Sequence, residues 1–266
     1  MPWPPYAKAS AALHVGAGLA VAAFPPAWPW ALAAVAANHL ALTGAGLWPR
    51  SQWLGSNWTR LPAAAAARNE IALTIDDGPD PEVTPAVLDL LDAARMRATF
   101  FCIAQTAAAH PALCRDIVRR GHSVQNHSDR HSKAFSLLGP RAMAAEIHAA
   151  QERLADITGE RPRFFRAPAG LRNPFLAPVL QRLELQLVSW TRRGFDTVRR
   201  EPTALVARLG KGLAAGDILL LHDGNAARTA SGEALVVAAL PALLARFDRA
   251  GLRGVTLPAA AGSDPA

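Results

Sequence analysis

The sequence predicts an α/β fold of parallel strands and crossover helices, preceded by a pair of apolar helices. Beyond residue 70, seven short runs rich in β-forming residues alternate with longer helical patterns. Strands that alternate with helices pair in parallel, so the topology is either an α/β barrel or a doubly wound sheet. Ahead of this region no charged residue lies between Lys8 and Arg50, which sets the amino-terminal part of the chain apart.

Two apolar stretches, 9–24 and 28–47, flank a proline-rich break. The second has the roughly 20 residues that a membrane-spanning helix needs, whereas the first is marginal and contains His14. Trp28 and Trp30, beside the prolines, suit a membrane interface. We therefore expect a membrane-associated helical hairpin.

Three other interpretations of this region stay open: a secretory signal, a soluble alanine-rich helical pair, or a single span whose first segment lies on the membrane surface. Three arginines follow the second stretch, at Arg50, Arg60 and Arg68. By the positive-inside rule they favour an inner (cytoplasmic) membrane protein whose large domain faces the cytoplasm.

A low-complexity joint follows the apolar region. Residues 61–69 read "LPAAAAARN", and periodic structure resumes directly afterwards. We place the domain boundary near Arg68, which divides the chain into a helical segment with its linker, residues 1–67, and a large domain, residues 68–262.

The large domain contains all of the predicted strands. They are the runs 71–75, 98–103, 122–126, 163–167, 185–190, 217–222 and 253–257. The helical patterns between them occupy 87–94, 111–120, 141–157, 174–183, 202–213 and 233–250. This repeated topology is not accompanied by a repeat in the sequence itself.

Size and charge narrow the functional classes. The 266 residues are 51% hydrophobic and carry a net charge of +7, so one large domain with a sizeable core is expected. The basic residues are not interleaved with aromatic residues, so nucleic-acid binding is not expected. Cys102 and Cys114 lack the spacing of a zinc or disulfide motif and are expected as buried apolar residues.

Polar residues with catalytic chemistry fall at the ends of the strand candidates. Asp76 and Asp77 follow the first run, His127 follows the third, Arg166 lies in the fourth, and His222 ends the sixth. In an α/β barrel the carboxyl ends of the strands form one rim, where loops build the active site. The topology thus predicts that these side chains converge.

His127 and His131 are four residues apart, so on a helical turn they project from one face and can hold one ion. A carboxylate must complete the set, because an open catalytic zinc site typically has three protein ligands. Asp76 or Asp77 can supply it, and the other acid stays ionised as a base. Gly78 turns the chain so that both carboxylates face the rim.

Five motifs occur in order along the domain: "TIDDGPD", "NHSDRH", "RAPAG", "SWTRRGFD" and "LLLHD". In these motifs the region 68–257 resembles the polysaccharide deacetylase family, also called the NodB-homology or carbohydrate esterase 4 group. The resemblance implies a distorted (β/α)7 barrel. It does not extend to the apolar hairpin.

The resemblance also implies a role for each site residue. Three residues match the family's ligands for a divalent metal, usually zinc: Asp77, His127 and His131. Asp76 matches the general base, and Arg166 matches the arginine that holds this base. His222 matches the catalytic acid, and Asp196 matches the aspartate that orients it. Asp223, which has no such match, is expected to be a turn or cap residue.

The implied function is hydrolysis of a linear amide C–N bond, namely removal of an N-acetyl or other N-acyl group from a carbohydrate. The apolar hairpin makes a membrane- or lipid-linked glycan a candidate substrate. Two alternatives stay open: an esterase that removes O-acetyl groups from a carbohydrate, and a non-catalytic carbohydrate-binding protein on the same fold.

The fourth motif departs from the family pattern. Arg193 and Thr197 stand where the family usually has Asp and Trp, whereas the orienting Asp196 is present. The acetyl-pocket wall therefore differs and a positive charge is added near the site, which puts an ordinary chitin-like or peptidoglycan substrate in doubt. The sequence leaves open whether Arg192 and Arg193 contact a phosphate or only solvent.

Overall fold

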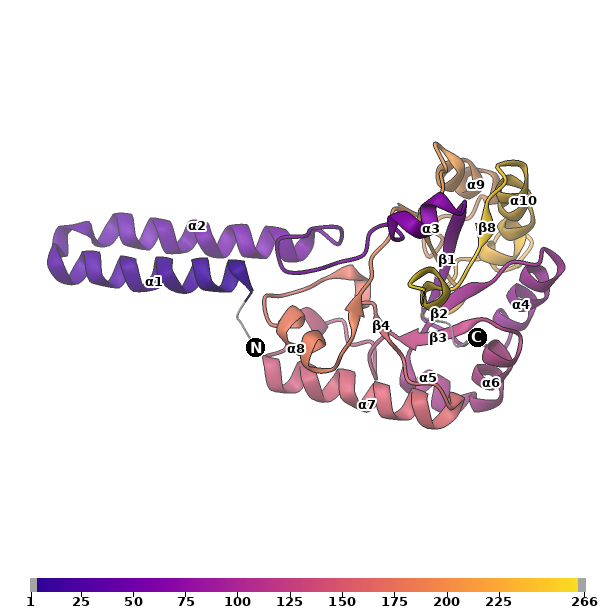
Figure 1. Ribbon diagram of the computed structural model, residues 1–266, viewed down its shortest axis with the longest axis horizontal. Helices are drawn as coiled ribbons and strands as arrows, with labels where there is room; N and C mark the ends of the chain where they lie inside the picture. The colour runs from indigo at the N-terminus through magenta and orange to yellow at the C-terminus, as the bar shows by residue number, and fades with distance from the viewer. Residues whose placement is uncertain (1–3, 263–266) are drawn as a thin grey trace.

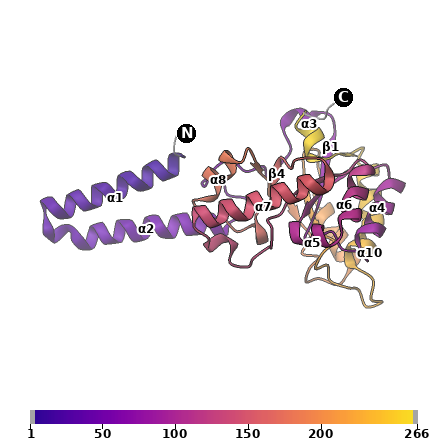
Figure 2. The same ribbon diagram turned by 90° about the horizontal axis from the view of Figure 1, so that it is seen from below.

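The computed structural model describes residues 4–262 and shows an α/β body from which a long helical hairpin projects (Figure 1). The hairpin consists of α1, Pro5–Ala23, and α2, Trp28–Leu47, joined by the short 3-10 helix η1, Pro25–Ala27. The two helices lie side by side in both views and extend away from the body (Figure 2). The expected apolar hairpin is therefore present.

The body is built on one parallel sheet. Its strands are β1, Glu70–Asp76; β2, Ala98–Cys102; β3, Ser123–Asn126; β4, Phe164–Phe165; β5, Gln186–Leu187; β6, Arg192–Arg193; β7, Ile218–His222; and β8, Arg253–Gly254. They are ordered β5-β4-β3-β2-β1-β7-β6, and β8 pairs with the start of β1. Every predicted run contains a strand, and the two-residue β6 is an addition that the sequence patterns do not indicate.

The strand order is that of a barrel, in which successive strands are neighbours and the last ones return to the first, and not that of a doubly wound sheet. Neighbours follow chain order from β1 to β5, and β7 returns to β1. Within residues 4–262 no ladder joins β5 to β6. Single bridges of Trp58 with Val188 and of Arg60 with Asp217 place the segment 58–61 in this opening. The distorted barrel is thus confirmed as a half-barrel of parallel strands.

Helices lie around the outside of the sheet (Figure 1). They are α3, Ala63–Ala67; α4, Thr84–Ala93; α5, Ala104–Ala109; α6, Pro111–Arg119; α7, Pro140–Thr158; α8, Leu176–Arg182; α9, Pro202–Gly210; α10, Leu235–Arg249; and α11, Leu257–Ala260. Each predicted helical pattern overlaps one of them. The predicted domain boundary at residues 67 and 68 falls at the end of α3.

β1 lies inside the sheet between β2 and β7, and all seven of its residues are buried. Leu73 and Ile75 belong to the main apolar core, together with residues of α4 and α10. Thr74 and Asp76 alternate with them and so point to the opposite face of the sheet. One strand thus packs against the helix layer and also carries polar groups to the inside of the half-barrel.

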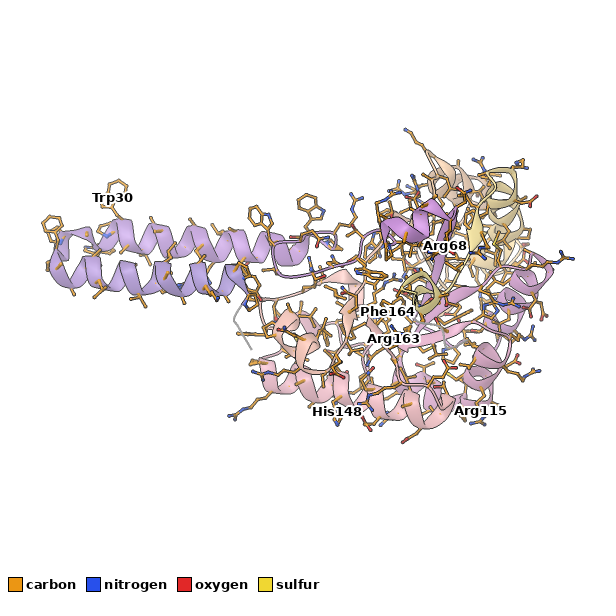
Figure 3. All side chains as sticks on the ribbon, viewed as in Figure 1. Trp30, Arg68, Arg115, His148, Arg163 and Phe164 are labelled. Carbon is orange, nitrogen blue, oxygen red and sulfur yellow. The ribbon has the colours of Figure 1, made fainter. Side chains whose placement is uncertain are left out.

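The hairpin has almost no core of its own. Ala45 and Gly46, at the foot of α2, are the buried residues of its two helices. Large apolar side chains such as Leu40 and Trp30 are exposed, and Trp30 projects from the hairpin near its far end (Figure 3). The segment Pro25–Leu47 is long and apolar enough to cross a membrane.

The foot of the hairpin is fixed to the body by hydrogen bonds. The backbone N–H of Arg172 donates to the Gly46 carbonyl at 3.0 Å, and its guanidinium donates to the Ser51 carbonyl at 2.9 Å. The Tyr6 hydroxyl donates to the Pro174 carbonyl. A Cβ at Gly46 would lie 2.2 Å from the Arg172 carbonyl oxygen, so this close approach requires glycine.

Candidate active site

The predicted site residues meet at the carboxyl ends of the central strands. Asp76 ends β1 and pairs in register with His222, the last residue of β7. Paired residues of parallel strands present their side chains to the same face, so both groups lie on the inner side of the half-barrel. His127 follows β3 and Arg166 follows β4, and their contacts join them to the same cluster.

Asp77, His127 and His131 form a compact set of possible metal ligands. The Asp77 Oδ1 atom lies 3.2 Å from His127 Nε2 and 3.3 Å from His131 Nε2. One ligand atom from each residue lies within 4.8 Å of the others. Ligands about 2.0–2.1 Å from a tetrahedral zinc are separated by about 3.3 Å. The two separations from Asp77 match this spacing, so the set is compatible with a zinc-sized cation.

The protonation preferences of these groups also suit a cation. Burial opposes ionisation of Asp77, but the hydrogen bond to His127 and the nearby histidine charges outweigh it, so the pKa of Asp77 is lowered. Burial lowers the pKa of His131, and the charge of His127 lowers it further. Burial also disfavours protonation of His127, yet Asp76 and Asp77 raise its pKa overall. A metal cation between these groups would replace that proton as the counter-charge.

The two histidines lie on a loop, which corrects the expectation of a helical turn. The backbone is left-handed at Ser128, with φ 68°, and at His131, with φ 52°. The side chain of Asn126 accepts from the Ser128 N–H at 2.8 Å, and Ser128 Oγ accepts from the His131 N–H at 3.0 Å. Because these side chains satisfy the backbone donors, the segment does not need a helical ladder to hold both imidazoles together.

The turn after β1 explains how two adjacent carboxylates face the same point. Asp77 has φ 75°, which takes its side chain off the regular pleat. A Cβ at Gly78 would lie 2.3 Å from the carboxylate oxygens of Asp223, so only glycine fits. Asp223 is more than a turn residue, since its buried carboxylate accepts from Thr84 and ties β7 to α4. Burial raises the pKa of Asp223 to about 7.

Arg166 is a fully buried cation that holds Asp76. Its Nη1 lies 2.6 Å from Asp76 Oδ1 and donates to Thr74 Oγ1 at 2.7 Å. Its Nη2 donates to the Ser189 carbonyl at 2.8 Å, and its guanidinium lies 4.2 Å from the centre of the Phe101 ring. Burial lowers the pKa of Arg166, and the charge of Asp76 opposes this shift. The geometry fixes one oxygen of Asp76 and leaves Oδ2 facing His127, 3.8 Å from its Nε2.

Arg166 also orients His127 through its backbone. The Arg166 carbonyl lies 2.8 Å from His127 Nδ1. A carbonyl can only accept, so Nδ1 carries a proton and Nε2, beside Asp77 and His131, is the nitrogen left to bind a metal. Such an outer partner is what sets the tautomer of a metal-binding histidine.

His222 is held by Asp196, as the resemblance implies. One Asp196 oxygen lies 3.0 Å from His222 Nδ1, and the other accepts from the backbone N–H of His222 at 2.7 Å. Burial disfavours protonation of His222, but the hydrogen bond and charge of Asp196 outweigh it, with help from Asp76 and Asp77, and raise the pKa of His222. A raised pKa would allow His222 to donate a proton beside Asp76, the last residue of β1, and Asp77, which follows it.

Comparisons with known proteins identify the family of this chain. A family model described as "Polysaccharide deacetylase" matches residues 63–188. A peptidoglycan-N-acetylglucosamine deacetylase of Bacillus cereus is 33% identical over 189 residues, which cover 70% of this chain and 85% of the relative. The chain belongs to the polysaccharide deacetylase family. It is thus a hydrolase of a family that acts on N-acetyl amide bonds.

Two further comparisons extend this assignment of the deacetylase. A chitooligosaccharide deacetylase of Azorhizobium caulinodans is 34% identical over 197 residues, which cover 69% of this chain and 93% of the relative. The solved structure of the peptidoglycan N-acetylglucosamine deacetylase Bc1960 superposes with a TM-score of 0.70 at 24% identity, covering 78% of this chain and 94% of that one. This superposition supports the fold.

Thr74 and Ser189, which support the site from behind, begin the motifs "TIDDGPD" and "SWTRRGFD", but the motifs do not indicate this role. Thr74 donates to the Leu219 carbonyl at 2.6 Å and accepts from Arg166, while the Ser189 carbonyl takes a second guanidinium donor. One signal was available for Thr74: it is a polar residue inside an apolar run, two positions before Asp76 and hence on the same face. Ser189 contributes only its backbone carbonyl, an interaction that no pattern of side chains can indicate.

We predict that the chain binds one zinc ion through Asp77, His127 and His131. Substituting Asp77→Asn, His127→Ala or His131→Ala should each weaken binding by more than about 100-fold, because loss of an outer-shell partner alone typically costs 10–100-fold. Calorimetric titration of chelator-treated protein with Zn²⁺ measures this. His148→Ala, on the exposed side of α7 (Figure 3), is the matched control and should bind normally. Wild-type affinity in His131→Ala would contradict the ligand set.

Proposed function

We propose that this deacetylase is a metal-dependent hydrolase that removes N-acetyl groups, or other N-acyl groups, from a carbohydrate. The observation that carries the proposal is the grouping of a two-histidine, one-carboxylate metal site with a second carboxylate, Asp76, and an Asp196-bound imidazole, His222. The relatives named above act on peptidoglycan N-acetylglucosamine and on chitooligosaccharides. Both substrates are N-acetylated carbohydrates, which fits an amide-cleaving site.

Each group has a part in amide hydrolysis. A divalent metal, zinc in our proposal, would be held by Asp77, His127 and His131 and would polarise the acetamide carbonyl while acidifying water. Asp76, fixed by Arg166, accepts the proton of the attacking water through its other oxygen. The C–N bond then breaks, and His222 gives its proton to the departing amine nitrogen. Acetate and a free amino sugar are the products.

The buried partners of these groups provide preorganisation. Arg166 places Asp76 through one short contact, and its remaining donors are used by Thr74 and by main-chain carbonyls. Asp196 grips both the backbone and the ring of His222, so the imidazole has one orientation. Such fixed geometry lowers the barrier because little reorganisation is left for the reaction step.

We expect Asp76→Asn to lower kcat by about 100- to 10,000-fold, the usual contribution of a general base. Zinc affinity should change far less, since Asp76 is outside the ligand set. Acetate release from N-acetylated oligosaccharides, with and without a chelator, measures the first quantity, and an O-acetylated sugar assayed in parallel separates amidase from esterase activity. Sugar binding without acetate release from any metal-loaded sample would show a non-catalytic carbohydrate-binding protein instead.

The charge of Asp196 should set the upper pH limit of the reaction. Asp196 raises the pKa of His222, and the acid works only while protonated, so activity falls as the pH rises through that pKa. Asp196→Asn removes the charge and should move the alkaline limb of the kcat profile to lower pH. Asp156→Asn, on the outer helix α7, should leave the profile in place. An unchanged limb in Asp196→Asn would mean that another group is the acid.

We also propose that the hairpin inserts into the inner (cytoplasmic) membrane. The 20 residues of α2 span about 30 Å at 1.5 Å per residue, which matches the hydrocarbon core. Exposed tryptophans lie near both ends of this helix, with Trp28 and Trp30 at the far end and Trp48 and Trp53 after its foot, as in the aromatic belts of membrane proteins. Because a hairpin returns to its starting side, Lys8 and the catalytic body share one face, which the following arginines favour as cytoplasmic.

The double substitution Leu32→Arg/Leu40→Arg should release the full chain from membranes, since an arginine within the hydrocarbon core costs up to about 2.5–3.5 kcal/mol of insertion free energy. The fraction that stays in the pellet after alkaline carbonate extraction measures this. Ala112→Arg on α6, at the end of the molecule opposite the hairpin (Figure 1), is the control. A wild-type chain that is extracted completely would favour the soluble helical pair, and a reporter fused after Leu61 decides the side.

A further inference from the structure

A basic groove lies at the foot of the hairpin, between the end of α2 and the strand β6. It encloses about 740 Å³. Five basic residues line it: Arg50, Arg192, Arg193, Arg208 and Lys211. No carboxylate is among the described residues that line it. The groove therefore combines a large volume with an excess of positive charge.

Four of these five cations are not neutralised by an acid. Arg192 is the exception, because its charge is neutralised by the buried Asp217. In contrast, no ion pair within residues 4–262 involves the other four. Arg50 and Arg208 reach only backbone carbonyls, at 3.3 Å and 3.0 Å, and the buried Nε of Arg193 has no hydrogen-bond partner. The groove therefore favours a ligand that carries negative charge and accepts hydrogen bonds from these cations.

Aromatic rings hold two of the guanidinium groups in place. Arg193 lies 5.4 Å from the centre of the Trp190 ring and 4.9 Å from that of Phe195. Arg208 lies 4.6 Å from the centre of the same Phe195 ring. Two like charges on one ring repel each other, and a multivalent anion between them removes that repulsion. Stacked, planar guanidinium groups are the residues of choice for phosphate recognition.

The groove adjoins the reaction site. Arg193 pairs in register with Leu220, two residues before His222, so its side chain leaves the same face of the sheet as the proposed acid. Trp190 also lies between the two, since the Arg166 guanidinium is 6.0 Å from the centre of its ring. An anion in the groove can thus belong to the same small molecule as the amide at Asp76.

We propose that this groove binds the phosphate or diphosphate that joins an N-acetylated sugar to a membrane lipid. The inference rests on the proposed deacetylase function and names its substrate class. Trp48 and Arg50, which follow α2 directly, line the groove, so it opens where the hairpin would leave the bilayer. A neutral glycan polymer offers no counter-charge to the four free cations, whereas a glycosyl phosphate does.

The test compares three substrates on the full, metal-loaded chain in proteoliposomes. They are polyprenyl-diphosphate-linked N-acetylglucosamine, soluble N-acetylglucosamine 1-phosphate and neutral tri-N-acetylchitotriose. Arg193→Gln and Arg193→Gln/Lys211→Gln remove charge from the groove. Arg115→Gln removes the same charge from the far side of the body (Figure 3).

We expect Arg193→Gln to raise KM for both phosphorylated substrates by about tenfold, the effect of losing one charge-assisted hydrogen bond. The double variant should raise it further, and Arg193→Lys should restore part of it. KM for the neutral trimer should change far less than KM for the phosphorylated substrates, and unchanged zinc affinity shows that the variants are folded. Arg115→Gln should match the wild type on every substrate, and the lipid-linked form should have the lowest KM.

Equal effects of Arg193→Gln on the neutral and phosphorylated substrates would overturn the phosphate site. A soluble sugar phosphate used as well as the lipid-linked form would overturn the lipid source of the phosphate. Absence of acetate release from all three substrates would instead defeat the proposed function. In that event equilibrium binding of N-acetylglucosamine 1-phosphate to the wild type and to Arg193→Gln still tests whether the groove binds phosphate. A phosphate site requires weaker binding in the variant.

Discussion

The buried ion pair of Arg166 and Asp76 is the interaction on which the rest of the site depends. A guanidinium that is 1% exposed is tolerated only because a carboxylate and several oxygen acceptors surround it. The same residue joins β1, the segment that follows β5 and, through its carbonyl, the loop of His127. Loss of either charge would leave the other buried and unpaired, so the base, the ligand loop and the sheet edge are secured together.

The alternation of side chains along β1 makes this arrangement compatible with a stable core. Leu73 and Ile75 add to the apolar cluster under the helices, while Thr74 and Asp76 supply polar groups inside the half-barrel. A register shift by one residue would exchange the two sets and bury the acids among leucines. Folding stability and site geometry are thus specified by the same strand.

The sequence alone predicted the features that follow from residue periodicity and from the order of the motifs along the chain. The strand runs and the five motifs placed Asp77, His127 and His222 at one rim, because parallel strands bring their carboxyl ends together. The sequence did not predict features that depend on local backbone geometry. The ligand loop is left-handed at His131, and β6 is only two residues long, too short for a periodic signal. The pairing of Arg192 with Asp217 joins residues 25 positions apart along the chain, which no local pattern encodes.

The hydrogen bond between Arg172 and Gly46 attaches the hairpin rigidly to the body, so the hairpin does not act as a flexible linker. A flexible linker would let the body sample many heights and tilts, with a reach that grows as the square root of its length. Here Arg172 belongs to the segment that follows the "RAPAG" motif, so helix and catalytic rim are mounted on the same piece of backbone. The length of the two helices therefore fixes the distance between the far end of the hairpin and the catalytic rim.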